Sequence, residues 1–259
     1  MEYSVIENGL DNELLSAEEL RARIRNVGEE RYHHRHPFHI MMHEGRLSRG
    51  QLQAWALNRF YYQSRIPIKD AIILSRSDDV SFRLAWRKRI IDHDGDATGA
   101  GGIDRWLKLA EATGLDPAEV TREDAVLPAT RYAVNEYLRL VEKRTLLEAV
   151  ASSLTEMFSR ELIALRIERL HKYYPWLSSG LDYFQARLSQ APEDARFAFD
   201  YVYEHAATRP LQESALRALR DKCDILWAQL DALYFAYVQP CWPPRGVFSL
   251  PESAHGPAD

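Results

Sequence analysis

The chain has 259 residues, of which 46% are hydrophobic and 27% charged, and its net charge is -5. This composition is typical of a globular protein and excludes a disordered one. The negative charge argues against nucleic acid as a partner, because phosphate binding needs a basic surface. No apolar run is long enough to span a membrane, and the acidic N-terminus does not resemble a secretory signal. Only two cysteines are present, Cys223 and Cys241, so we expect a reduced, cytoplasmic protein with no membrane partner.

Helical periodicity recurs from the N-terminus onward, whereas alternating strand patterns are hard to find. A capping box at Ser16 predicts the start of a short helix. Pro37 suits the first position of a second helix, which should end near Gly45. Ser48 is expected to cap a longer helix, with a kink or break at Pro67 because proline removes a backbone donor.

The remaining chain predicts a series of further helices joined by short loops. The loop GDATGAGG, residues 95–102, is expected to be a plain connector without a hairpin. The last helix is apolar around most of its circumference, which indicates a central helix or a subunit interface. Residues 241–259 are expected to be poorly ordered. We therefore predict one all-α domain over residues 1–259, with helices near 80–94, 103–114, 128–142, 144–172, 179–188, 191–206 and 210–238.

The histidine-rich stretch RYHHRHPFHIMMHEG, residues 31–45, raises the question of a metal site. His39 and His43 lie four apart on one helical face, but no cysteine is near and a third ligand cannot be named. A di-iron site would need two Glu-x-x-His pairs inside helices, and only Glu168–His171 qualifies. We therefore expect no metal. The spacing around Ser152 also lacks the elbow of a serine hydrolase.

Three pairs of polar residues at i,i+4 spacing lie within otherwise apolar helical stretches. Each pair alone is more often part of a solvated face. If the three pairs converge, they form a cationic, aromatic-walled cavity, which suits a planar polycarboxylate because guanidinium groups bind carboxylates bidentately. A histidine in such a cavity can act as a general base near neutral pH. The pairs are Arg59/Gln63, Arg89/His93 and Tyr183/Arg187, and Glu156, Arg166 and Lys222 are further polar residues in apolar helices.

The chain resembles the pyrroloquinoline-quinone (PQQ) synthase family over about residues 31–239. Seven long stretches carry the resemblance: YHHRHPFHIMMHEG, NRFYYQSRIPIKDA, RIIDHDG, VLPATRYAVNEYL, SSLTEMF, YYPWL and KCDILWAQLDALYFAY. The resemblance implies a compact haem-oxygenase-like, TenA-like bundle of about seven helices that forms a homodimer. It also implies closure of helices over the ligand, with residues 150–190 as the lid.

The implied activity is the last step of PQQ biosynthesis. The family closes a ring of AHQQ, 6-(2-amino-2-carboxyethyl)-7,8-dioxo-1,2,3,4,7,8-hexahydroquinoline-2,4-dicarboxylate, and removes eight electrons from it. O2 is the co-substrate, PQQ is the product and H2O2 is released. No metal or organic redox cofactor is implied, because the quinol intermediates themselves reduce O2. Two other functions stay open, a thiaminase-like hydrolase on the same fold, which would need a cysteine in the pocket, and a non-catalytic binding protein.

The resemblance also implies roles for individual residues. His93 would be the main acid/base residue, Tyr183 and Arg187 would lie on the O2 side, and Glu156 would complete the polar shell. His36, His39 and His43 are expected to cap and pack the short helix, with His34 at the surface. The substrate would be held by Tyr32, His33, Arg59, Gln63, Arg89, Tyr137, Arg166 and Lys222.

One position departs from the family pattern at the implied O2 site. Ile163 stands where the family carries a histidine, and Ser159-Arg160 stands where Ala-Pro is usual. Loss of an imidazole removes a hydrogen-bond donor for reduced oxygen species, which would slow the later oxidations. Alternatively, an apolar residue there makes a dry O2 pocket. The sequence does not separate a natural variant from an engineered one, and a chain that binds AHQQ or PQQ but oxidises slowly is an open alternative.

Overall fold

The computed structural model describes residues 13–97 and 99–251. Within these ranges the chain forms eleven α-helices, three 3-10 helices and one hairpin of two very short strands, so the all-α prediction is confirmed. The helices outnumber the predicted seven or so, because several are short. In order they are α1 (Ala17–Arg31), η1 (His33–Arg35), α2 (Pro37–His43), α3 (Arg49–Leu74), α4 (Val80–Asp94), β1 (Gly95–Asp96), β2 (Gly99–Ala100), α5 (Gly102–Thr113), α6 (Pro117–Arg122), α7 (Pro128–Lys143), α8 (Leu146–Ala151), η2 (Ser152–Phe158), α9 (Ser159–Tyr173), η3 (Pro175–Gly180), α10 (Asp182–His205) and α11 (Arg209–Tyr237).

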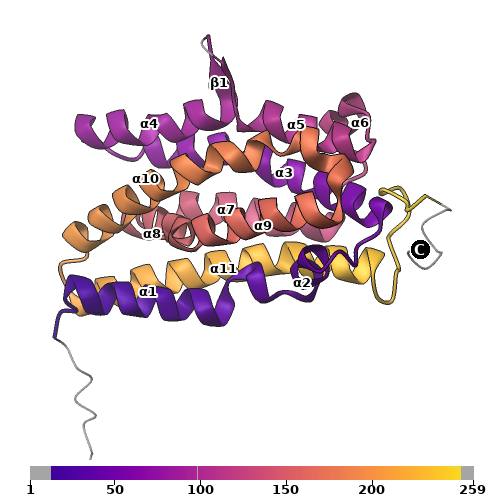
Figure 1. Cartoon of the computed structure of the whole chain (residues 1–259). Coiled ribbons are helices and arrows are strands. Elements are labelled where there is room, and N and C mark those ends of the chain that lie inside the picture. The colour runs from indigo at the N-terminus through magenta and orange to yellow at the C-terminus, as the bar shows by residue number, and fades with distance from the viewer. Residues whose placement is uncertain (1–12, 98, 252–259) are drawn as a thin grey trace, which may run out of the picture.

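The long helices run roughly along one direction in stacked layers (Figure 1). Helices α1 and α11 lie side by side at one edge of the bundle, and α4 and α5 lie at the opposite edge. Helix α3 packs against α4, α5 and α7, and α11 packs against α7, α8 and η2. Helix α11 buries residues along its whole length, as its apolar circumference predicted, although it lies at an edge of the bundle and not at its centre. No helix in the described ranges combines the length and apolarity needed to cross a membrane.

The predicted helix starts near the N-terminus are confirmed by their capping bonds. Ser16 and Ser48 each form a reciprocal capping box, with Glu19 and Gln51 respectively. Pro37 occupies the first turn of α2, and the side chain before it accepts a hydrogen bond from a backbone N–H. These bonds satisfy amide donors that a helix N-terminus otherwise leaves unpaired.

The chain does not break at Pro67 or near Pro192, and one predicted continuous helix is interrupted. Helix α3 continues through Pro67, and α10 continues through Pro192, where two separate helices were expected. Pro67 is buried against neighbouring helices, and this packing offsets the lost backbone hydrogen bond. The predicted helix over 144–172 tightens into a 3-10 turn at 152–158, which places Glu156 on its own short element.

The loop after α4 contains a hairpin that was not predicted. Gly95 and Asp96 pair with Ala100 and Gly99 in an antiparallel register. The chain then turns back so closely that a Cβ on Gly101 would collide with the carbonyl oxygen of His93. Glycine is therefore required here, and the hairpin holds the end of α4 in place.

The prediction of a poorly ordered tail is wrong for the part that is described. The Phe248 amide donates to the Ala125 carbonyl at 3.0 Å, and the Tyr237 hydroxyl donates to the Phe248 carbonyl at 2.9 Å. Val247, Phe248 and Leu250 pack on the core. Residues 252–259 lie outside the described ranges.

Candidate active site

A cavity inside the bundle collects nearly all of the predicted site residues. Its empty space is about 1110 Å³, counting the mouth that opens to solvent. Twelve predicted residues line it: Tyr32, His33, Arg59, Gln63, Arg89, His93, Tyr137, Glu156, Ile163, Arg166, Tyr183 and Arg187. They are spread over residues 32–187 of the sequence and meet only because the helices pack side by side.

The three i,i+4 pairs, whose convergence the spacing left open, meet at the cavity. Each pair lies on the inward face of its helix, α3, α4 or α10, and Gln63, Arg89, His93 and Arg187 are all at least nine-tenths buried. The Tyr183 hydroxyl donates to Gln63 Oε1 at 3.1 Å, which joins α10 to α3 across the cavity. The alternative of three unrelated solvated faces is therefore wrong.

Arg187 and Arg89 are already paired with carboxylates. Arg187 donates to Glu156 at 2.8 Å and to Asp194 at 3.1 Å, and Arg89 lies 3.3 Å from the other oxygen of Asp194. Burial raises the pKa of the Glu156 carboxyl, but Arg187 and Arg89 outweigh burial and leave that pKa below its ordinary value. Glu156 is therefore ionised at neutral pH, and Arg187 is held firmly charged.

Arg59 and Arg166 differ from these two arginines. Neither forms an ion pair with a carboxylate of the described residues, although both line the cavity. Arg59 lies over the Tyr62 ring, 3.9 Å from its centroid, and burial lowers the pKa of Arg166 to about 10. Two cations without a carboxylate partner in a buried cavity favour an anionic ligand, because an uncompensated buried charge is costly.

His93 has the hydrogen bonding of a potential base. Its Nδ1 lies 3.0 Å from the Arg89 carbonyl oxygen, which can only accept, so Nδ1 carries the proton and Nε2 is left with a lone pair. Burial and the charge of Arg187 lower the pKa of His93. The imidazole is therefore neutral at pH 7 and able to accept a proton.

The histidines of residues 31–45 only partly have the roles that were predicted for them. His36 caps α2 as expected, by accepting from the Phe38 amide at 3.1 Å. His39 was expected to pack behind the helix, but it lines the cavity next to His33, with their Nδ1 atoms 2.9 Å apart. His34 is only partly exposed. Within the described ranges, no group of three or more His, Cys, Asp or Glu is arranged to hold a metal ion.

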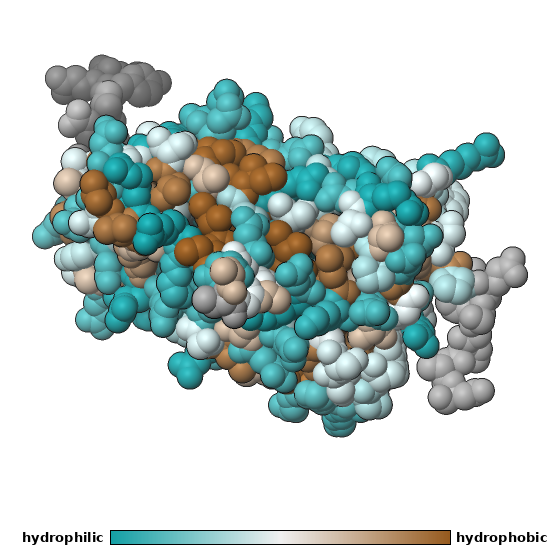
Figure 2. Space-filling model, turned by 90° about the horizontal axis from the view of Figure 1, so that it is seen from above, coloured by the Kyte–Doolittle hydropathy of each residue, from teal (hydrophilic) through white to brown (hydrophobic). Residues whose placement is uncertain are grey.

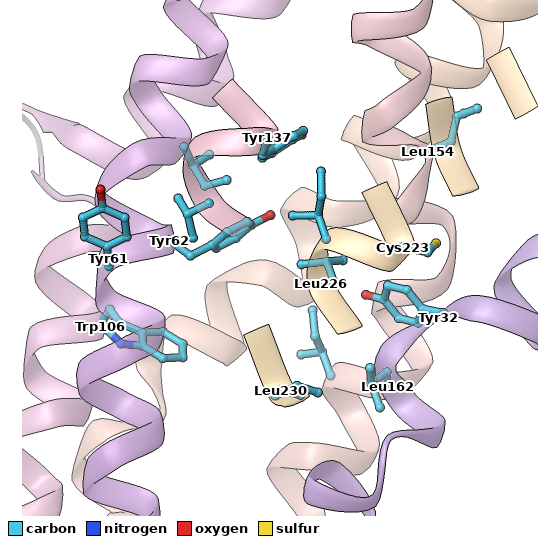
Figure 3. Close-up of a cluster of buried hydrophobic side chains, with 14 of the residues drawn as sticks. Tyr32, Tyr61, Tyr62, Trp106, Tyr137, Leu154, Leu162, Cys223, Leu226 and Leu230 are labelled. Atoms are coloured by element: carbon cyan, nitrogen blue, oxygen red, sulfur yellow. The ribbon is translucent and has the colours of Figure 1, made fainter. Parts of the chain in front are cut away.

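Lys222 does not line the cavity, contrary to the prediction. Its ammonium group donates to the Tyr62 hydroxyl at 2.8 Å and lies 3.4 Å from the centroid of the Tyr137 ring. Tyr62 and Tyr137 are stacked, and Figure 3 shows both rings on the same side of the buried cluster. Burial lowers the pKa of Lys222 well below its ordinary value. Lys222 therefore supports the aromatic wall from behind.

Several wall residues were missed in the sequence. Tyr62, Trp106 and Gln229 line the cavity, and so does a buried ion pair between Lys69 and its neighbour Asp70. The signal for the ion pair was present in the sequence, since adjacent Lys and Asp residues are unusual inside an apolar helical stretch such as RIPIKDAIIL.

Cys223 has the properties of a structural residue. It is fully buried, it does not line the cavity, and burial raises the pKa of its thiol to about 12. A thiol nucleophile needs a lowered pKa and access to the substrate. Figure 3 shows its sulfur between Leu154 and Tyr32, among buried side chains. These features argue against a cysteine-dependent hydrolase.

The chain matches known proteins over most of its length. Pyrroloquinoline-quinone synthases of Granulibacter bethesdensis and Acidiphilium cryptum are 52% and 55% identical to it, over 93% and 91% of this chain and 94% and 96% of theirs. A bifunctional coenzyme PQQ synthesis protein C/D of Methylorubrum extorquens is 53% identical over 89% of this chain and 62% of its own length.

Solved structures with low sequence identity share the fold. A domain with a haem-oxygenase-like fold from Shewanella denitrificans matches with a TM-score of 0.74 at 11% identity, over 92% of this chain and all of the other. A TenA homologue from Pseudomonas syringae matches with a TM-score of 0.67 at 13% identity, over 86% and 97% of the two chains. The family model described as TENA/THI-4/PQQC matches residues 21–232, and the chain belongs to this family.

Proposed function

We propose that this chain is a pyrroloquinoline-quinone synthase, an oxidase that closes the last ring of AHQQ and oxidises it with O2 to PQQ. Identity of 52–55% to proteins of that name, along nearly the whole chain, supports this activity. The observation that carries it is the pair of cations without carboxylate partners, Arg59 and Arg166, in one buried cavity with the neutral base His93.

The cavity suits a planar polycarboxylate. The carboxylates of AHQQ would take the place of the missing partners of Arg59 and Arg166, and burial strengthens such contacts relative to water. Tyr62, Tyr137 and Trp106 offer flat apolar surfaces to the ring system. Arg89 and Arg187 keep their internal carboxylate partners and so provide a rigid cationic wall rather than free binding groups.

The chemistry assigned to this chain's residues follows from their positions. Holding the substrate amine near the ring carbon that is conjugated with a quinone carbonyl favours ring closure by addition, which keeps both quinone oxygens, and this contribution is largely entropic. His93 Nε2 then takes a proton from carbon as the ring becomes a quinol, and the quinol passes its electrons to O2 with release of H2O2. No metal or organic redox cofactor takes part in this scheme. Tyr183 and Arg187 form the side assigned to O2, and helices over residues 150–190 close over the ligand.

The proposed working form is a cytoplasmic homodimer. Exposed hydrophobic side chains support a subunit contact: Val80, Leu84 and Ile91 of α4 are each more than two-fifths exposed. Figure 2 shows hydrophobic residues gathered on the side of the molecule that carries α4 and α5.

Mixing the purified chain with AHQQ under air tests the proposal. We expect the absorbance of PQQ to appear together with O2 consumption. Arg166→Met should weaken substrate binding by roughly tenfold or more, because a charge-assisted hydrogen bond is lost. Arg35→Met, at an exposed position outside the cavity, is the matched control.

Other outcomes would favour the alternatives. Binding of AHQQ without O2 uptake would indicate a binding protein, or an oxidase slowed by Ile163. The absence of both binding and turnover would contradict the proposal.

A further inference from the structure

His33 and His39 form a directly bonded pair of histidines in the cavity wall. Their Nδ1 atoms lie 2.9 Å apart, and the two rings meet edge to face with centroids separated by 4.7 Å. Both side chains are almost fully buried, at 5% and 3% exposure. His33 belongs to η1 and His39 to α2, so the bond joins two consecutive short elements.

The backbone determines which of the two rings donates. His39 Nδ1 also lies 3.1 Å from the carbonyl oxygen of His33, which can only accept a hydrogen bond. The proton must therefore be on Nδ1 of His39, and this N–H also faces Nδ1 of His33. Nδ1 of His33 is then the acceptor, so the single proton of neutral His33 is on its Nε2.

Both imidazoles are neutral in the absence of ligand. Burial lowers the pKa of each ring well below its ordinary value, and the nearby charges of Arg59 and Arg166 lower it further. Arg166 Nη2 lies 3.4 Å from both Nε2 and Nδ1 of His39, so a permanent positive charge faces this ring. The doubly protonated, charged form of either imidazole is therefore disfavoured. In that form both ring nitrogens would be donors, and the neighbouring histidine would not determine the tautomer.

The other nitrogen of His33 is available to a ligand. His33 lines the cavity, and its Nε2 makes no hydrogen bond to any described residue. An N–H at this position attracts a carboxylate, whereas a lone pair would repel it. The tautomer of His33 thus decides whether this part of the wall favours or opposes an anion.

We propose that His39 is a positioning residue, which fixes the proton of His33 on Nε2 so that His33 presents a hydrogen-bond donor to a substrate carboxylate. This inference rests on the proposed function for the identity of the anion. His39 itself does not have to touch the ligand for this role.

Two substitutions at position 39 distinguish the effect of losing the hydrogen-bond donor from the effect of changing the packing. His39→Asn keeps an N–H donor near the place of Nδ1, and His39→Leu keeps bulk but removes the donor. His43→Leu is the matched control, because its ring stacks on that of His39 from the next turn of α2 and makes no hydrogen bond to His33 within the described ranges. Circular dichroism and thermal melts establish that each variant is folded.

The direct readout is the tautomer of His33, observed by 15N NMR of the ligand-free, histidine-labelled protein. We expect the Nε2–H form in the parent, His39→Asn and His43→Leu proteins, and a mixture of tautomers in His39→Leu. In titrations with PQQ, His39→Leu should bind roughly ten- to hundredfold more weakly, and His39→Asn within a few-fold of the parent. A parent protein with His33 protonated on Nδ1, or a folded His39→Leu protein that keeps the Nε2–H form and full affinity, would overturn the inference.

The two readouts keep this proposal apart from the proposed function. If the parent protein fails to bind PQQ, the proposed function is contradicted, while the NMR result still decides the role of His39. If all variants bind PQQ equally, the function stands and the positioning role is wrong.

Discussion

The Glu156 carboxylate accepts a hydrogen bond from Arg187 at 2.8 Å, between η2 and α10. This bond divides the charges of the cavity into two groups. On one side, Arg187 and Arg89 are neutralised by Glu156 and Asp194. On the other, Arg59 and Arg166 have no carboxylate partner among the described residues. The first group holds the wall together, and the second group is left for the substrate.

Replacing Arg187 tests the structural half of this division. Arg187→Met would remove the cation shared by the partly buried carboxylate of Glu156 and the buried carboxylate of Asp194, which keeps Arg89 as a partner, and the cost of breaking a buried pair is up to about 3–5 kcal/mol. We expect the free energy of unfolding, measured by urea denaturation, to fall by this amount. Arg23→Met is the control: Arg23 pairs with Glu213 at 3.2 Å but is 42% exposed, so its loss should cost less than about 1 kcal/mol. Equal effects of the two substitutions would contradict the division.

Replacing His93 tests its proposed role as the general base. His93→Ala should leave the affinity for PQQ nearly unchanged and slow the oxidation of AHQQ roughly 10²- to 10⁴-fold, the usual contribution of a general acid or base. Stopped-flow absorbance and an oxygen electrode measure the rate, and equilibrium titration measures the affinity. His205→Ala removes an exposed histidine from α10 and should change neither. Equal losses of binding and rate in His93→Ala would assign His93 to binding instead.

The pH dependence of kcat/KM follows from the environment of the same histidine. Burial and Arg187 lower the pKa of His93 below the ordinary value of 6.5. A base must be unprotonated to work, so activity should be retained as the pH falls to 6.5 and be lost only below it. The profile of kcat/KM reports the free enzyme, which is the state described by this pKa. If kcat/KM already fell by half above pH 7 as the solution was made more acidic, the base would have a raised pKa. That result would exclude His93, whose surroundings lower its pKa.

The core of the site could be predicted from the sequence because it depends on helical spacing. Arg59/Gln63 and Arg89/His93 are polar pairs on otherwise apolar helices, and spacing alone puts each pair on one face. Asp194 could not be found in this way, since it lies two residues after Pro192 in the polar stretch SQAPEDAR, which is typical of a solvated turn. Its role depends on the packing of α10 against α4, which local sequence does not determine. The 3-10 geometry at Glu156 was missed for the same reason.

Position 163 offers the last test, because it separates substrate binding from the reaction with O2. Ile163 lies in the cavity wall on α9, 8% exposed and one turn before Arg166. Ile163→His introduces a donor for reduced oxygen species, so the late oxidations should become faster and intermediates should accumulate less. Multiwavelength stopped-flow measurements with AHQQ and O2 would show this. The affinity for PQQ should stay within a few-fold of the parent, because the carboxylate-binding arginines are unchanged.

The same substitution should have a cost in stability. An imidazole in a site shaped for an isoleucine is a buried polar group without an assured partner, and the loss is about 1–3 kcal/mol. Ile163→Leu is the control for shape, with a cost below about 1.5 kcal/mol and no change in the oxidation rates. If Ile163→His is folded and oxidises no faster than Ile163→Leu, the missing imidazole does not limit turnover. The apolar side chain would then be a sufficient wall for O2.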